Sequence, residues 1–364
     1  MNAQRSRISR FQLFFLLVQS QIGIGLLSLP SDIQKSAGGD GWLSVLVAGA
    51  VTQVLLLVFW ALCRRFPQRT LPEISVLLFG KRGGKAVNGI FFACFIAVAS
   101  LASALYIRTI GNWLLILTPK WILLLLVLAT CVYMALENLR MIARFYVISS
   151  FMFVILFLMS VLNFKNEMHL SYLLPVGKSG LDHILVGSHS TFFAMLGFEI
   201  FLFGFAHVAG QPRKLFATAS LANLFVTIFY AYFVAICLVS FSPNALSRVN
   251  DPLLFMFKGL SYQVIERLDL IFLALWIIPM TTSIITYLYM AGKSIAIRTE
   301  PYRKAMLVSS GLIFATGYWF AGMNDMDLVG HWIQNVYLIA LAVLPSAMLL
   351  LSFARRTTDQ GALP

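Results

Sequence analysis

Charged side chains are scarce in this chain of 364 residues. Asp, Glu, Lys and Arg make up 11% of the sequence, 60% of the residues are hydrophobic, and the mean hydropathy is +0.85. A soluble domain of this size has too small an interior to bury that much apolar surface. The chain also lacks a long polar linker or a break in composition. The sequence therefore predicts a single transmembrane domain over residues 1–364.

The motifs of the common enzyme classes are also missing. The sequence contains no HExxH, GxSxG or Walker motif, so metalloprotease, serine hydrolase and ATPase chemistry lack their parts. The four cysteines lie in or at the ends of apolar runs, without CxxC or Cys/His spacing, which is typical of packing residues. We therefore expect no enzymatic activity and no cofactor.

Long apolar runs make up most of the sequence. A membrane-spanning helix needs about 20 mostly apolar residues. The first run follows a basic N-terminal stretch and continues past residue 29 without a small-residue cleavage site, so we interpret it as a span rather than a signal peptide. Ten runs qualify, roughly 11–34, 41–63, 86–117, 119–137, 140–163, 183–208, 214–241, 264–292, 304–323 and 328–354.

The basic residues between these runs predict the orientation. With both termini in the cytoplasm, 19 of the 27 Lys and Arg residues fall on the cytoplasmic side, seven fall outside, and Arg108 lies within a span. This asymmetry is the one expected of membrane proteins. It also accounts for the net charge of +13. The charges are spread among short loops rather than gathered on one face, so we expect contact with the lipid bilayer and no nucleic-acid partner.

The longest external connection in mid-chain, residues 164–182, divides the ten runs into five and five. If the halves are structural repeats, about 11–163 and 183–354, the odd number of spans forces the second half to insert upside down. The sixth span would then correspond to the first. We therefore predict an all-α integral membrane protein with ten transmembrane helices in a 5+5 inverted repeat.

Glycines interrupt both corresponding spans. The first contains Gly23 and Gly25, and the sixth contains Gly197 followed by Glu199. From the ends of their spans the two interruptions lie at similar depth, near the middle of the bilayer. Two discontinuous helices meeting there form the usual binding site of inverted-repeat carriers. Close helix packing is the alternative reading of such glycines.

Several segments carry a resemblance to a known family. In order along the chain they are IGIGLLSLP (22–30), GW (41–42), TP (118–119), LGFEIFLFGF (196–205), IERLDLIFLALWII (265–278), TTS (281–283) and YLYMAGK (287–293). The chain resembles the B-subunit permeases of endospore germinant receptors, a branch of the amino acid–polyamine–organocation transporter superfamily.

The resemblance implies a ten-helix permease fold with broken helices 1 and 6. It also implies a place in the inner spore membrane, beside a second multi-spanning subunit and a lipoprotein. The implied role is sensing a small germinant, commonly an amino acid. One departure concerns the third span, where relatives often carry a carboxylate; residues 86–117 contain no Asp or Glu.

Glu199 and Arg108 are the strongest ligand-binding candidates. A carboxylate near the midplane is costly, so Glu199 is either a binding or proton-accepting group or a structural anchor. Arg108 either receives a ligand carboxylate or extends its side chain outward to the membrane surface. The amide groups that follow the first break suit a carboxylate. The ligand-binding prediction comprises Gly23, Gly25, Leu26, Tyr106, Arg108, Gly197, Glu199 and Trp276.

Hydroxyl groups in the eighth span are weaker candidates. Related folds place hydroxyls here against the first helix, so Thr281 and Thr282 could help to hold Na⁺. Hydroxyls bonded back to their own helix after Pro279 are the favoured reading, so we expect no metal. Tyr106 and Trp276 could equally be packing residues, and Asp32 is expected at the external mouth.

Two connecting segments could move. Residues 70–85 are expected to form a short interfacial helix ended by glycines, and residues 250–262 an external helix capped by Asn250 or Asp251. A secondary transporter of amino acids or cations with the same fold and pocket is the rival function.

Overall fold

The computed structural model describes residues 7–23, 25–165, 168–259, 267–296, 299–323 and 325–355. Within these ranges the protein is helical, and the one bridge of strand type joins Ile8 to Val208. The helices are α1 (Arg10–Gln21), α2 (Gly25–Ala37), η2 (Gly38–Asp40), α3 (Gly41–Arg65), α4 (Leu71–Trp113), α5 (Lys120–Ala135), α6 (Leu139–Ser149), α7 (Phe151–Val161), η3 (Leu162–Lys165), η4 (Leu170–Leu173), α8 (Leu181–Ala194), η5 (Phe198–Ile200), α9 (Phe201–Gly204), η6 (Phe205–His207), α10 (Pro212–Ser240), α11 (Pro243–Leu246), α12 (Pro252–Lys258), α13 (Leu268–Ile295), α14 (Thr299–Ala321) and α15 (Met326–Ala354).

Two helices begin at a capping box. The Ser9 hydroxyl accepts from the Gln12 backbone N–H of α1, while the Gln12 side chain accepts from the Ser9 N–H. Thr70 and Glu73 make the corresponding arrangement at α4. Each box satisfies amide groups that have no partner within the helix. The caps fix the start of α1 at Arg10 and of α4 at Leu71.

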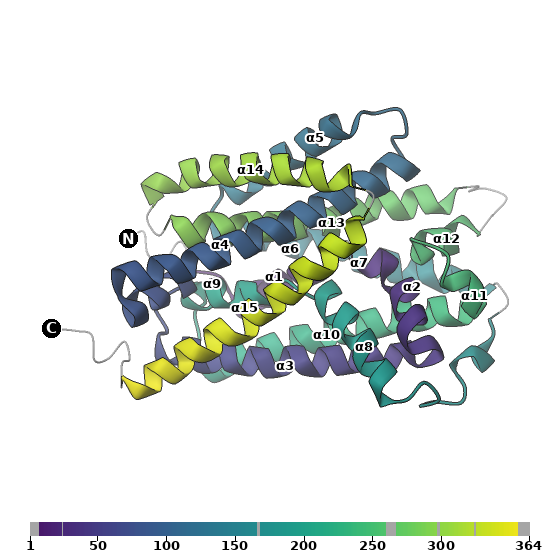
Figure 1. The fold of residues 1–364 in the computed structure, drawn as a ribbon, viewed down its shortest axis with the longest axis horizontal. Helices are drawn as coiled ribbons and strands as arrows, with labels where there is room; N and C mark the ends of the chain where they lie inside the picture. The colour runs from purple at the N-terminus through teal and green to yellow at the C-terminus, as the bar shows by residue number, and fades with distance from the viewer. Residues whose placement is uncertain are drawn as a thin grey trace.

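The helices form a bundle around the long helix α4, which packs against α13, α14 and α15. On the other side of the bundle α3 packs against α10 and α8. Figure 1 shows α15 and α4 running diagonally across the bundle, with α14 above them and α3 along the lower edge. The two groups of helices enclose the short segments at which α1 and α8 end.

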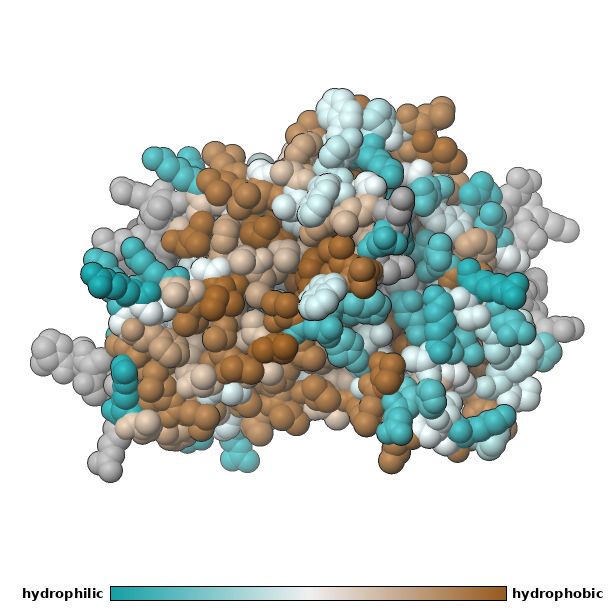
Figure 2. Space-filling view, in the orientation of Figure 1, coloured by the Kyte–Doolittle hydropathy of each residue, from teal (hydrophilic) through white to brown (hydrophobic). Residues whose placement is uncertain are grey.

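The surface has the pattern of a membrane protein. Figure 2 shows hydrophobic side chains across the middle of the visible face, with hydrophilic side chains at both ends. Among the described residues, six helical segments are long and apolar enough to cross a membrane, and a seventh is the bent pair formed by residues 181–194 and 198–207. The prediction of an integral membrane protein is therefore confirmed.

Each of the ten predicted runs coincides with a helix or with a pair of helices. The first is divided into α1 and α2, the fifth into α6 and α7, and the sixth into α8 and the short helices that follow. Helix α5 has 16 residues, fewer than a span usually needs. The all-helical fold class is confirmed, whereas the number of ten spans and the repeat boundaries stay predictions.

Loops that were assigned to one side of the membrane contact one another. On the predicted cytoplasmic side, Trp60 donates to the Pro212 carbonyl (2.9 Å) and Arg65 to that of Ser352 (3.0 Å). On the predicted external side, the Asp40 carboxylate accepts from the Gly177 and Ser179 amide groups at 2.7 and 2.8 Å. These pairs agree with the predicted alternation of the loops.

The helices predicted in the two connecting segments, residues 70–85 and 250–262, have different outcomes. The interfacial helix ends as expected at Gly80, whose φ of 74° is in the left-handed region that favours glycine, and the chain continues directly into the long part of α4. The external helix is α12. Asp251 is its N-cap residue, but the predicted capping hydrogen bond is wrong: its carboxylate accepts from Trp113 Nε1 at 3.3 Å. Residues 260–262 of this segment lie outside the described residues.

Candidate functional site

The first span is interrupted where the sequence predicted. Helix α1 ends at Gln21, Ile22 has extended backbone angles (φ −85°, ψ 112°), and α2 begins at Gly25. The last carbonyl groups of α1 and the first amide groups of α2 therefore lose their helical partners. Glycine is required for packing as well, because a Cβ on Gly25 would lie 2.9 Å from Ala194. Both readings of the glycines thus apply at this break.

The sixth span is interrupted at the corresponding place. Helix α8 ends at Ala194, and the chain turns through Gly197, whose φ is 121°. The segments on either side of the turn differ in direction by 52°. A side chain at Gly197 would be strained by this backbone angle, and it would also collide with the carbonyl oxygen of Ser20. The two interrupted helices therefore touch through Gly197 and Ser20.

Tyr230 of α10 connects the two breaks. Its hydroxyl lies 3.0 Å from the Gln21 carbonyl oxygen and 2.8 Å from that of Ala194. These are terminal carbonyls of α1 and α8, which otherwise lack partners at the helix ends. A single hydroxyl thus bridges both interrupted spans.

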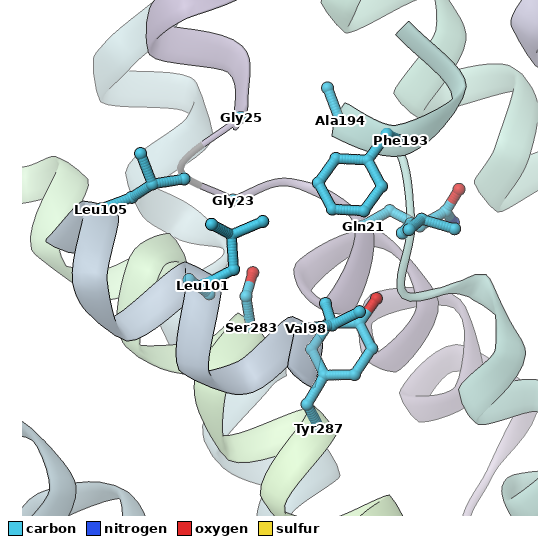
Figure 3. A pocket seen from close by; sticks show the side chains of 12 residues that line it. Gln21, Gly23, Gly25, Val98, Leu101, Leu105, Phe193, Ala194, Ser283 and Tyr287 are labelled. Atoms are coloured by element: carbon cyan, nitrogen blue, oxygen red, sulfur yellow. The ribbon is translucent and has the colours of Figure 1, made fainter. Parts of the chain in front are cut away.

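A cavity of about 60 Å³ lies beside the two breaks; we call it the inner cavity. This volume holds several water molecules. Figure 3 shows Gly23 and Gly25 crossing it, with Phe193 and Ala194 on one side and Ser283 and Tyr287 of α13 on the other. No charged residue lines it among the residues that the structure describes. The lining residues are Gln21, Gly23, Gly25, Val98, Leu101, Ala102, Leu105, Phe193, Ala194, Leu196, Ser283 and Tyr287.

A larger cavity of about 340 Å³, which we call the outer cavity, adjoins the inner one. Gly25, Leu101, Leu105, Phe193 and Ala194 line both, so a wall of these residues separates the two spaces. In contrast to the inner cavity, the outer one is lined by charged and polar groups. They are Ser28, Ser31, Asp32, Lys35, Arg108, Ser190, Asn250, His331 and Gln334.

Glu199 is buried behind the turn and does not line the inner cavity. Its carboxylate accepts from the Gly197 backbone N–H at 2.9 Å and from the hydroxyl of Tyr337. The Tyr287 hydroxyl is near the same carboxylate, although it makes no hydrogen bond of normal geometry. These contacts stabilise the positive-φ turn at Gly197. Tyr287, which lines the inner cavity, lies between the carboxylate and the space available to a ligand.

The remaining predicted ligand-binding residues do not line the inner cavity. Arg108 lines the outer cavity rather than the inner one. Leu26 and Trp276 are fully buried, Tyr106 is nearly so, and all three lie outside the linings of both cavities. The Trp276 ring stacks on Phe272 at 5.3 Å, which is a packing arrangement. The structure therefore brings Gly23 and Gly25 together at the inner cavity and places the other six elsewhere.

The hydroxyls of the eighth span bond mainly to their own helix. Thr281 donates to the Ile277 carbonyl at 2.7 Å, and Thr282 and Ser283 each lie 3.0 Å from the Pro279 carbonyl. Thr282 also contacts the first span, with its hydroxyl 3.3 Å from the Gln19 carbonyl oxygen and 3.2 Å from the Gln19 side-chain oxygen. Thr281 and Ser283 are thus back-bonded, whereas Thr282 contacts both helices, and the choice between back-bonding and a sodium site stays a prediction. In the described part of the chain, no group of three or more His, Cys, Asp or Glu side chains could hold a metal ion.

Three tyrosines were not identified from the sequence: Tyr230, Tyr287 and Tyr337. Tyrosine is frequent here, with 12 in the chain, and most aromatic residues of membrane proteins pack or lie at the interface. The contact of Tyr230 with Gln21 spans 209 residues. Local sequence patterns do not predict a contact between residues so far apart in the chain.

A family model described as a spore germination protein matches residues 7–316. The chain belongs to the spore germination permease family. The match includes both breaks and the helices that surround the inner cavity.

Individual relatives carry the same description. The chain is 23% identical to spore germination protein GerQB of Bacillus cereus over 355 residues, which is 96% of each chain. It is also 23% identical to spore germination protein YndE of Bacillus subtilis (strain 168), over 98% of this chain and 99% of YndE. The similarity therefore extends over nearly the full length of these relatives.

Solved structures share the fold. The transporter Mhp1 of the nucleobase-cation-symport-1 family, in a closed conformation with bromovinylhydantoin bound, superposes with a TM-score of 0.70 at 15% identity, covering 97% of this chain and 80% of Mhp1. MhsT in complex with L-phenylalanine superposes with a TM-score of 0.67 at 13% identity, covering 97% and 99%. The fold is thus that of an inverted-repeat transporter, as the division into five and five spans predicted.

Proposed function

We propose that this permease is the membrane subunit of a spore germinant receptor, and that it senses a small germinant, an amino acid, at the inner cavity. The observation that supports this is the coincidence of two interrupted helices with a cavity whose lining includes both glycines of the first break. Unpaired amide and carbonyl groups at such breaks bind ligands in inverted-repeat carriers. Membership of the spore germination family directs the proposal to germination.

The proposed binding mode follows from the backbone. The free N–H groups at the start of α2, together with the positive end of the helix dipole, suit a carboxylate. The carbonyls at the ends of α1 and α8 suit an ammonium group. These carbonyls already contact the Tyr230 hydroxyl. A ligand ammonium group would therefore either replace that hydroxyl or bind the same carbonyls beside it. A cavity of about 60 Å³ is small for an amino acid, so binding requires the wall at Phe193 and Leu101 to move outward.

We place the protein in the inner spore membrane with both termini in the cytoplasm. The partners proposed are a second multi-spanning subunit and a lipoprotein of the same receptor. In this arrangement ligand binding would shift the conformation of a complex, and no catalysis is needed. The family relationship and the distribution of basic residues in the loops support this placement.

Genetic deletion tests the proposal. Spores that lack the gene are expected to lose the response to one germinant, while cells grow normally on that compound. A chain with the Val98→Phe change, which fills the inner cavity, should fail to restore the response when it is produced at normal level. Spores that germinate normally with every germinant would contradict the proposal.

A secondary transporter of amino acids or cations is the second candidate, and it is favoured by the superposition on two transporters. Uptake of labelled amino acids by the purified protein in liposomes separates the two functions. Concentrative uptake, together with a growth defect of the deletion strain and normal germination, would establish transport. Binding without uptake would support the receptor.

A further inference from the structure

The outer cavity contains two hydrogen-bond donors without partners. Among the residues that the structure describes, the Arg108 guanidinium makes no hydrogen bond and no ion pair. The Ser31 side chain is 1% exposed, lines the same cavity, and its hydroxyl has no partner. A buried polar group that lacks a partner costs free energy. A bound molecule that accepts hydrogen bonds would remove this cost at Ser31 and would also give a partner to Arg108, which is half-buried.

The charges around the cavity favour an anionic group at Arg108. Asp32 and Lys35 lie 3.9 Å apart on α2 and offset each other's charge. Asp251 is the carboxylate whose charge acts on Arg108. Among the described residues it makes no ion pair with the guanidinium and its oxygen accepts from Trp113, so the Arg108 N–H groups stay available to a ligand. His331 is the remaining titratable group of the lining. The planar fork of an arginine is suited to receiving a carboxylate through two parallel hydrogen bonds.

Acceptors are present in the same lining. The amide oxygen of Gln334 is buried without a partner, and the Asp32 carboxylate also lines the cavity. These groups suit an ammonium group or another donor. The volume of about 340 Å³ lies within the range of small-molecule sites, whereas the inner cavity is several times smaller.

We propose that the outer cavity is a second binding site, which takes a small zwitterion such as a free amino acid with its carboxylate on Arg108 and Ser31. The wall of Leu101, Leu105, Phe193 and Ala194 separates this site from the inner cavity, so a molecule can bind at the outer site while the inner site is closed. The outer site does not depend on the germinant site proposed above, although it selects the same chemical class.

Variants of two residues distinguish the sites. Arg108→Gln removes the charge and the fork from the outer cavity. Val98→Phe fills the inner cavity, which Val98 lines, without adding bulk to the outer lining. Lys35→Gln is the matched control, since it removes one positive charge from the outer cavity at a position where that charge is paired with Asp32. Arg108→Lys keeps the charge and loses the fork, and it serves if the glutamine variant does not fold.

The measurement uses the purified full-length protein in lipid nanodiscs. Each of the twenty standard amino acids, acetate and methylammonium is tested for its effect on the unfolding temperature, and the dissociation constant is then measured for every compound that stabilises the protein. We expect at least one amino acid to stabilise the wild type, acetate to act more weakly, and methylammonium to have no effect. At least one stabilising compound should keep its affinity in Val98→Phe, as expected of a ligand that does not occupy the inner cavity. For that compound Arg108→Gln should weaken binding about 10- to 150-fold, Arg108→Lys by less, and Lys35→Gln little.

Other outcomes overturn the proposal. If Val98→Phe abolishes binding while Arg108→Gln leaves it intact, the ligand binds only at the inner cavity; the outer site is then refuted, and the germinant proposal is supported. If no amino acid stabilises the wild type, or if methylammonium acts as well as the amino acids, the outer site is not a zwitterion site. Loss of binding to the same extent in Lys35→Gln and Arg108→Gln would indicate attraction by general positive charge, which also refutes the specific site.

Discussion

The hydroxyl of Tyr230 lies within hydrogen-bond distance of two carbonyl oxygens, those of Gln21 and Ala194, at 3.0 and 2.8 Å. Each carbonyl belongs to the end of a different interrupted helix. A hydroxyl carries one proton and can donate fully to only one of them at a time. The second carbonyl therefore keeps capacity for another donor. Because Gln21 and Ala194 also line the inner cavity, a ligand that enters it can alter this bridge directly.

Replacing Tyr230 with Phe should loosen both breaks. The change leaves two carbonyls without a side-chain donor, and the expected loss of stability is about 1–3 kcal/mol. We expect a lower unfolding temperature of the purified protein and a weaker germination response at equal protein level. Tyr232→Phe is a matched control on the same helix, because its hydroxyl contacts Ser160 at 2.8 Å, away from the breaks. Normal stability and response in Tyr230→Phe would remove this residue from the site.

Gly197→Ala should be among the most damaging small substitutions in the chain. The methyl group would occupy a backbone conformation with φ of 121° and would meet the Ser20 carbonyl. We expect a sharp fall in the amount of protein in the membrane and loss of response. Gly89→Ala in α4 is the control: no atom lies within 4 Å of the added Cβ, and alanine favours helix by about 1 kcal/mol. Equal yields of the two variants would contradict the close contact of the breaks.

The breaks could be predicted from the sequence because the glycines of the first and sixth runs lie at similar depth, and an acidic residue, which is costly at that depth, follows Gly197. The role of Glu199 could not be predicted. Helical periodicity assigns a face to a residue only while the helix continues, and Glu199 lies in the short 3-10 helix η5 directly after the turn. Its carboxylate consequently faces Gly197 and Tyr337 rather than the inner cavity. Arg108 was expected either to receive a ligand carboxylate or to extend outward, and the structure places it in the lining of the outer cavity.

Glu199 and Tyr337 should behave as one unit. Glu199→Gln keeps one oxygen as an acceptor but presents an amide donor to groups that are themselves donors. Because these hydrogen bonds hold the turn at Gly197, we expect a membrane-inserted protein that is less stable by about 1.5–3 kcal/mol and responds more weakly. Tyr337→Phe should weaken the response as well, and the double variant should be little worse than Glu199→Gln alone, as double-mutant cycles show for residues in contact. Additive effects would indicate that the two residues act separately. A wild-type response of Glu199→Gln would make Glu199 a bystander.

Single cysteines test the orientation of the loops. The four native cysteines are buried and should react slowly with a membrane-impermeant maleimide. In sealed, right-side-out vesicles we expect labelling of Lys178→Cys and none of Arg82→Cys until the membrane is opened. Both positions lie in loops or helix ends outside the apolar layer in the predicted topology. Labelling of Arg82→Cys in intact vesicles would overturn the cytoplasmic assignment of residues 64–85.

Asp251 should make ligand binding at the outer cavity depend on pH. Burial raises the pKa of this carboxyl above 3.8, while the hydrogen bond from Trp113 and the charge of Arg108 act in the opposite direction. Above the pKa the ionised carboxylate competes with a ligand for Arg108, and below it the neutral acid does not. Affinity for a carboxylate ligand should therefore rise as the pH falls through the pKa of Asp251, provided that the ligand carboxylate stays ionised.

The test compares a chain that retains Asp251 with an Asp251→Asn chain. Both carry His331→Gln, so that His331 does not contribute to the pH dependence, and both retain the Asp32–Lys35 pair. In the chain that retains Asp251, the dissociation constant of the stabilising amino acid should decrease as the pH is lowered from 7 through the pKa of Asp251, which burial raises above 3.8. Asp251→Asn mimics the neutral acid and keeps an oxygen to accept from Trp113, so its affinity should already be high at pH 7 and should change little. Asp182→Asn, which removes a carboxylate at the start of α8 away from the cavity lining, should leave the pH dependence intact. If Asp251→Asn binds no more tightly than its parent at pH 7, the charge of Asp251 does not affect ligand binding. Asp251 then attracts Arg108 too weakly to compete with a ligand carboxylate.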